Sequence, residues 1–296
     1  MKHFLQALAA IALLAMAAAA PAPNLIKFSD LKARAHPAPT KTVRYGTDPL
    51  QVVDLWLPRG NGPFPTVLMI HGGCWQTDVA DRHLMDWVSD NLKHRGIAVW
   101  NIDYRGVDRP GGGYPGTFLD VAAAADALRS HAPEYHLDTK RVVAVGHSAG
   151  GHLALWLAGR PRLPATSPLR KPDPLPIAAV VSLGGLPDLE EETRVPNGCG
   201  TTVSATLAGG HYAETSVPRL APLGIRQYLV NGLNDPIIPT VLASDYQRRM
   251  TAAGDRVTID WIPASGHFEL IAPETRAWAD AVRRIEEALG DRQATR

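Results

Sequence analysis

A serine between glycines is the strongest chemical signal in the sequence. Gly146–Gly150 reads GHSAG, which matches the pattern G-x-S-x-G with Ser148 at its centre. The pattern lies between a predicted buried strand at 141–147 and a predicted helix at 149–159, the strand–turn–helix setting that exposes a nucleophilic serine. The N–H groups at the start of that helix favour negative charge. Ser148 is therefore the predicted nucleophile, and a glycine-lined helix cap is the plainer alternative.

A serine attacks a carbonyl only when a base removes its proton. His267, in PASGHFEL, is the histidine that follows the last predicted strand, where such a base is expected. His147 and His152 flank the serine and are expected to pack or to support the site. The acid that orients the base should lie between serine and histidine in the chain. Asp235, in NGLNDPIIP, is favoured over Asp188 because its strand is the penultimate one and its turn is tighter.

Acyl transfer also needs N–H donors aimed at the developing oxyanion. One donor should be the residue after the nucleophile, Ala149, and the other should come from the loop after the third strand. That loop begins His71-Gly72-Gly73, and glycines there let the main chain approach the substrate closely. Gly73 and Cys74 are the candidate loop donors, and His71 is expected to tie the loop down. A plain turn is the alternative reading of the glycines.

The surrounding elements alternate between strand and helix patterns. This alternation predicts an α/β fold: a mostly parallel, eight-stranded sheet with helices on both faces. The segment 186–223 lacks a clean period and is the predicted cap insertion. Strands are expected at 42–46, 51–58, 66–70, 97–105, 141–147, 177–185, 226–232 and 256–263, the first two as an antiparallel pair, and helices at 82–93, 118–131, 149–159, 242–253 and 273–289.

Composition narrows the function classes. The 296 residues are 45% hydrophobic and carry a formal net charge of +1, without blocks of like charge. This balance gives no indication of nucleic acid or of an anionic membrane surface as a partner. No His/Cys/Asp spacing suggests a metal site, and no cofactor is expected. A small-molecule ester or amide is the expected partner, and the sequence carries no signal for an oligomeric state.

The N-terminus has the layout of a secretory signal peptide. Lys2 precedes an apolar, alanine-rich run that ends in small residues, so residues 1–20 are the predicted signal, with cleavage near 18–20. The protein is then exported, to the periplasm or outside the cell, without stable membrane insertion; a single membrane anchor is the alternative. Residues 21–40 are expected to be a weakly ordered, flexible arm, and residues 41–292 the catalytic domain.

Together these motifs resemble the α/β-hydrolase fold. They are most similar to an esterase branch with an HGG-x-W loop, which includes kynurenine formamidase (arylformamidase)-like enzymes and bacterial carboxylesterases. The resemblance rests on HGGCW, YRG with GGGYPGTFLDV, GHSAGGHLALWLA, NGLNDPIIP and GHFEL, and covers about residues 41 to 290. It implies a nucleophile at Ser148, an acid at Asp235, a base at His267 and oxyanion donors at Gly73, Cys74 and Ala149. The formamidases carry an aromatic residue where this chain has Cys74.

The sequence contains two cysteines, Cys74 and Cys199. An even number in an exported protein favours a disulfide. Cys199 lies in the predicted cap, which in this architecture arches over the edge of the sheet that carries the 71–75 loop. A Cys74–Cys199 bridge is therefore predicted, and two free, buried thiols are the alternative.

Four aromatic residues lie in or beside loops expected near the site, and could line a substrate pocket or simply pack: Trp75, Tyr114, Tyr212 and Phe268. The predicted activity is hydrolysis of carboxylic esters with small to medium acyl groups. An amidase, arylformamidase or peptidase with the same triad is one alternative. A catalytically inactive, hydrolase-like binding protein is another, which the complete Ser–Asp–His order disfavours.

Overall fold

An eight-stranded sheet forms the centre of the protein. The computed structural model describes residues 23–290. The strand order is β1-β2-β4-β3-β5-β6-β7-β8. The strands are β1 (Lys41–Arg44), β2 (Val52–Trp56), β3 (Phe64–Ile70), β4 (Ala98–Ile102), β5 (Leu137–His147), β6 (Ala179–Leu183), β7 (Arg226–Gly232) and β8 (Arg256–Ile262).

The sheet is parallel except at one edge. β1 pairs antiparallel with β2, and β2 antiparallel with β4, whereas every other neighbouring pair is parallel. All eight predicted strands and the predicted antiparallel opening pair are confirmed. β5 begins earlier than predicted because residues 137–138 pair with residues 64–65 of β3 across a register shift. The parallel strands end at one edge of the sheet, where the motif loops follow β3, β5 and β7.

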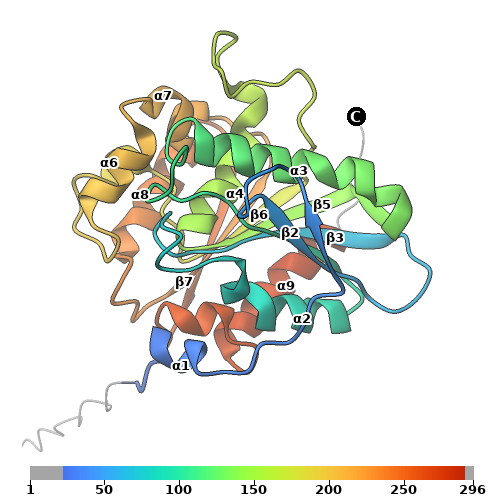
Figure 1. Ribbon diagram of the computed structural model, residues 1–296. Helices are drawn as coiled ribbons and strands as arrows, with labels where there is room; N and C mark the ends of the chain where they lie inside the picture. The colour runs from blue at the N-terminus through green and yellow to red at the C-terminus, as the bar shows by residue number, and fades with distance from the viewer. Residues whose placement is uncertain (1–22, 291–296) are drawn as a thin grey trace, which may run out of the picture.

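Helices cover both faces of the sheet (Figure 1). On one face lie α3 (Gly116–Tyr135), α4 (Ala149–Gly159) and α8 (Thr240–Ala252), whose apolar side chains share one buried cluster. On the other face α2 (Asp86–His94), preceded by the 3₁₀ turn η1 (Arg82–Met85), packs with α9 (Arg276–Gly290) in a second cluster. The strands are rich in Val, Ile and Leu because both faces are buried in this way.

The predicted cap consists of short helices between β6 and β7. They are α5 (Leu189–Glu192), α6 (Thr201–Ala208), α7 (Tyr212–Thr215) and the 3₁₀ turn η3 (Val217–Leu220). Leu207 and Val217 are fully buried and join the core cluster of α3 and α4. The cap therefore packs onto the same face as α4, the helix that begins just after Ser148.

The N-terminal arm (residues 23–40) is held against the domain, contrary to the expectation of a weakly ordered segment. It contains the helix α1 (Phe28–Lys32), in which Leu31 is fully buried. Its backbone and side chains bond to distant residues; for example, Arg34 pairs with Glu274 at 2.5 Å. The sequence showed no period there because the arm is held by distant parts of the chain: Ile26 and Arg34 bond to Glu269 and Glu274, and Ala35 and His36 to Trp87 and Asp86. The predicted signal peptide lies outside the described residues.

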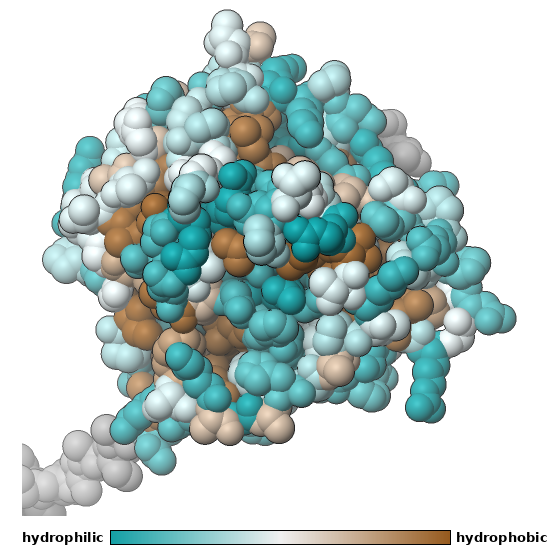
Figure 2. Space-filling view, viewed as in Figure 1, coloured by the Kyte–Doolittle hydropathy of each residue, from teal (hydrophilic) through white to brown (hydrophobic). Residues whose placement is uncertain are grey.

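On the face shown in Figure 2, hydrophobic residues lie among hydrophilic ones. The large hydrophobic side chains exposed in the described part of the chain are Val79, Leu233 and Val241. Between residues 23 and 290 no helix combines the length and the apolar character needed to cross a membrane.

Candidate active site

Ser148 occupies a strained turn between β5 and α4. Its backbone has φ +54° and ψ −122°, a region that non-glycine residues rarely adopt. The turn needs glycines on both sides: a Cβ at Gly146 would collide with the carbonyl of Gly150, and a Cβ at Gly150 with the carbonyl of Ile70. The glycines thus allow the turn to pack against the end of β3 and hold Ser148 at the start of α4.

The three predicted oxyanion donors have free N–H groups. Among the hydrogen bonds of residues 23–290, none uses the N–H of Gly73, Cys74 or Ala149. Gly73 and Cys74 have φ values of +102° and +54°, so the loop turns its backbone sharply after β3. Unpaired N–H groups near a nucleophile can stabilise an oxyanion.

His71 holds this loop in place through contacts with the main chain and with Asp103. Its Nδ1 lies 2.6 Å from the carbonyl oxygen of Gly72, and its Nε2 lies 3.2 Å from Oδ1 of Asp103. Its ring stacks on Tyr104 at 4.3 Å. Burial opposes ionisation of Asp103, but hydrogen bonds from His71 and Arg82 outweigh it and lower the pKa of this carboxyl group. His71 is thereby engaged in holding the loop.

His267 and Asp235 form a hydrogen-bonded pair. Nδ1 of His267 lies 2.6 Å from Oδ2 of Asp235, and both side chains are almost fully buried. The other oxygen, Oδ1, accepts the N–H groups of Ile237 and Ile238 at 2.8 and 2.9 Å. This turn after β7 fixes the carboxylate, and the carboxylate fixes the imidazole so that Nε2 remains available for a proton.

Asp188, the alternative acid, has other partners. Its Oδ1 accepts from the N–H of Glu190 and from the hydroxyl of Ser216, and its Oδ2 pairs with Arg249. It therefore caps α5 and ties the cap to α8. The structure brings Asp235, and not Asp188, to His267.

His147, the residue before Ser148, contacts the candidate base His267. His147 places its ring 4.4 Å from that of His267, and its Nε2 donates to the carbonyl of His267 at 3.1 Å. Burial, and then the neighbouring charge of His267, keep the pKa of His147 well below its usual value. His152 is likewise neutral, because burial lowers its pKa to about 4, and it bonds to the carbonyl of Thr215.

The turns that carry Ser148 and His267 are therefore in contact through His147. Ser148 is 3% exposed, and among the described residues its hydroxyl forms no hydrogen bond to His267. Contacts of this kind are often long in unliganded enzymes and shorten when substrate binds.

Gly184, after β6, leaves space for the candidate base, since a Cβ there would lie 3.2 Å from Nδ1 of His267. The sequence predicted that His147 packs or supports the site, whereas it gave no signal for Gly184.

The predicted disulfide is confirmed. Cys74 and Cys199 are bridged across 125 positions, with their Cα atoms 5.2 Å apart. The bridge joins the loop after β3 to the segment of the cap between α5 and α6. A candidate oxyanion donor is thus covalently tied to the cap.

The four predicted pocket aromatics have different environments. Trp75 is fully buried and meets His152 edge-on at 5.6 Å, so it belongs to the core instead of a pocket wall. The positive φ of Cys74 and Trp75 turns the chain inward at this point. Tyr212, the first residue of α7, packs partly buried against the core.

Tyr114 contacts the cap, whereas Phe268 lies beside the candidate base. Tyr114 stacks on His211 at 3.8 Å and donates its hydroxyl to Glu214 in the cap at 2.9 Å. Burial and Glu214 raise the pKa of Tyr114 to about 12. Phe268 directly follows the base, meets the ring of His267 edge-on at 5.3 Å and lines a cavity with it.

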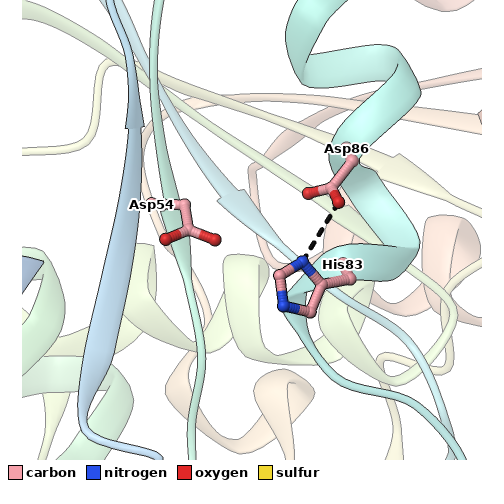
Figure 3. Close-up of side chains that lie close together, drawn as sticks. All are labelled: Asp54, His83 and Asp86. Atoms are coloured by element: carbon pink, nitrogen blue, oxygen red, sulfur yellow. Dashed lines mark hydrogen bonds and ion pairs between the residues drawn. The ribbon is translucent and has the colours of Figure 1, made fainter. Parts of the chain in front are cut away.

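One group of side chains has the composition of a cation site. Asp54, His83 and Asp86 have ligand atoms within 4.8 Å of one another (Figure 3). Asp54 is already satisfied, by the hydroxyl of Thr42 at 2.5 Å and by Nε of Arg82 at 2.6 Å. Because the guanidinium group neutralises Asp54 and repels a cation, we assign the group a structural role that ties β2 to η1 and α2.

Comparison with known proteins identifies the family. The model of the BD-FAE family matches residues 53–221. The chain belongs to the BD-FAE family. The matched segment of this BD-FAE chain includes the 71–75 loop and Ser148 and ends before Asp235 and His267.

The relatives of this BD-FAE chain include esterases. Esterase LipC of Mycobacterium tuberculosis is 28% identical over 253 residues, which cover 78% of this chain and 60% of LipC. The chain spans between 23% and 60% of the length of the curated relatives it matches.

Solved structures share the fold. The truncated form of a carbohydrate esterase from gut microbiota superposes with a TM-score of 0.72 at 20% identity, covering 87% of this chain and 100% of that one. Esterase B from Lactobacillus Rhamnosis (HN001) gives a TM-score of 0.73 at 21% identity, covering 88% and 91%. The chain thus has the predicted α/β-hydrolase fold.

Proposed function

We propose that this BD-FAE chain is a serine hydrolase that cleaves carboxylic esters of small to medium acyl groups. The observation that carries the proposal is the 2.6 Å contact between His267 and Asp235 beside the strained turn of Ser148. Family membership and the esterase names of the relatives support the same reaction class.

The proposed reaction has two halves. Oγ of Ser148 attacks the ester carbonyl while Nε2 of His267 takes its proton, and Asp235 stabilises the resulting imidazolium. The carbonyl oxygen becomes an oxyanion held by the N–H groups of Ala149 and of Gly73 or Cys74. The carbon–alkoxy bond then breaks, the alcohol leaves with the proton of His267, and the acyl group remains on Ser148. Water, deprotonated by His267, releases the acid and restores the serine.

Hydrolysis of p-nitrophenyl esters from acetate to dodecanoate tests the proposal. Ser148→Ala should lower kcat/KM by more than ~10³-fold, because the nucleophile is lost. Ser182→Ala is a matched control, since Ser182 is buried next to the same turn, where a Cβ at Gly151 would meet its Oγ at 2.5 Å. It should retain activity. Full activity in Ser148→Ala would overturn the site, and Ser148-dependent cleavage of amides but not esters would overturn the ester assignment.

We also propose that the protein is exported through its N-terminal signal. The apolar run before Pro21 and the disulfide support this, because disulfides persist in oxidising compartments. Sequencing the N-terminus of protein recovered from the periplasm or the medium tests it. A mature chain beginning near residue 21 is expected, whereas an intact Met1 on cytoplasmic protein would contradict it.

A further inference from the structure

A cavity of about 440 Å³ lies between the N-terminal arm and the loop that carries the candidate base. Residues 23–28 of the arm form one wall, and Pro236, His267 and Phe268 form the other. Pro236 directly follows the acid Asp235, and Phe268 directly follows the base. The cavity therefore opens beside the paired half of the proposed triad, and its volume falls within the range of small-molecule pockets.

The arm is bonded to the base loop. The buried carboxylate of Glu269 accepts the N–H of Ile26 on Oε1 at 2.5 Å and the N–H of Gly266 on Oε2 at 2.9 Å. One side chain thus fixes both the arm and the residue that precedes His267. The rings of Phe28 and Phe268 stack with their centroids 5.5 Å apart, so the two walls are in contact at the cavity.

The walls are mostly apolar. Leu25, Ile26 and Phe28 come from the arm, and a Cβ at Gly266 would lie 3.1 Å from Cδ1 of Leu25, so the leucine packs closely on the base loop. His267 is also among the residues that line the cavity. An apolar ligand group in this cavity would therefore lie next to the group that transfers protons.

The chemistry of the imidazole indicates which part of the substrate lies there. In the proposed reaction His267 gives its proton to the oxygen of the leaving alcohol. The alcohol oxygen must then lie within hydrogen-bond reach of His267, and the carbon skeleton attached to it must continue on the same side. The carbonyl oxygen is held elsewhere, by the 73–74 loop and Ala149.

We propose that the N-terminal arm is a wall of the alcohol subsite, and that this subsite takes an apolar, preferably aromatic alcohol group. The inference rests on the proposed esterase function and deepens it. The arm, which directly follows the predicted signal peptide, then contributes to substrate selection, and Leu25 and Phe28 are specificity-determining residues.

Acetate esters of ethanol, benzyl alcohol and 2-naphthylmethanol test this subsite with a constant acyl group. In the wild-type protein kcat/KM should rise with the size of the alcohol. Leu25→Trp narrows the cavity and should lower the naphthylmethyl-to-ethyl ratio of kcat/KM by about tenfold, the scale on which apolar pockets discriminate. Phe28→Ala removes the aromatic wall and should lower the same ratio. Ser29→Ala is the control, since Ser29 is exposed on the same arm and does not line the cavity.

These measurements distinguish a failure of the subsite proposal from a failure of the proposed esterase function. Unchanged ratios in both Leu25→Trp and Phe28→Ala, with hydrolysis still dependent on Ser148, would overturn the subsite and leave the esterase in place. A change in acyl-chain preference across ethyl esters, without a change in alcohol preference, would also overturn it. Wild-type protein that cleaves none of these esters through Ser148 would contradict the proposed function itself.

Discussion

The imidazole of His267 is held by one oxygen of Asp235, at 2.6 Å, while the other oxygen of that carboxylate is fixed by two backbone N–H groups. Asp235→Asn would keep the shape but offer an amide to Nδ1, which favours the wrong tautomer. We expect kcat to fall by about 10³- to 10⁴-fold, as in comparable triads, with little change in melting temperature. Steady-state kinetics and a thermal melt measure both effects.

Asp188→Asn provides the matched control for Asp235→Asn. Asp188 pairs with Arg249 and caps α5, so its loss should lower stability and leave kcat of the folded protein near the wild-type value. A larger loss of kcat in Asp188→Asn than in Asp235→Asn would reverse the assignment of the acid.

The disulfide should matter for both stability and catalysis. A link between Cys74 and Cys199 across 125 positions stabilises the fold by about 5 kcal/mol in the chain-entropy account, since it restricts the unfolded chain. The double variant Cys74→Ser/Cys199→Ser should melt roughly 10 °C or more lower. It should also lose kcat, because the N–H of residue 74 is no longer tied in place. Melting curves and ester kinetics that match the wild type would contradict this role.

A buried carboxyl group in the cap predicts a pH dependence of stability. Glu192 is fully buried, and its Oε2 accepts from the hydroxyl of Ser204 at 2.9 Å. Burial, and then the charge of Asp188, raise its pKa well above the usual value. The folded state thus favours the protonated form, so this stability is complete below the unfolded pKa and is lost as pH rises through the folded pKa.

Glu192→Gln should remove this dependence, because the amide keeps an acceptor for Ser204 and carries no charge. The free energy of unfolding of the variant, minus that of the wild type, should increase as pH rises from about 5 to about 8.5. Urea denaturation at several pH values measures the difference. Two curves that stay parallel over this range would show that the pKa of Glu192 is the same in the folded and the unfolded protein, contrary to the prediction.

The sequence predicted the elements that have a regular residue pattern and the turns that are marked by glycine. Buried strands appear as short apolar runs, and the glycines around Ser148 mark a turn whose packing leaves no room for a Cβ. The Asp235 turn and the His267 loop followed from their places after β7 and β8. Pairing Cys74 with Cys199 followed from the cysteine count and the expected position of the cap.

Other features depend on contacts that local sequence does not encode. The arm has no period, and its order comes from Glu269, Phe268 and Glu274, far along the chain. Trp75 enters the core because two successive residues adopt positive φ, which neither residue type favours. The neutral state of His147 follows from complete burial between two loops.

Covalent labelling of Ser148 tests the central claim most directly. A p-nitrophenyl alkylphosphonate mimics the tetrahedral state of ester cleavage and reacts with an activated serine. Mass spectrometry of the digested protein should find the adduct on Ser148, with loss of esterase activity in proportion, and none in Ser148→Ala. An adduct on another residue that abolishes activity, or full activity in protein labelled at Ser148, would contradict the account.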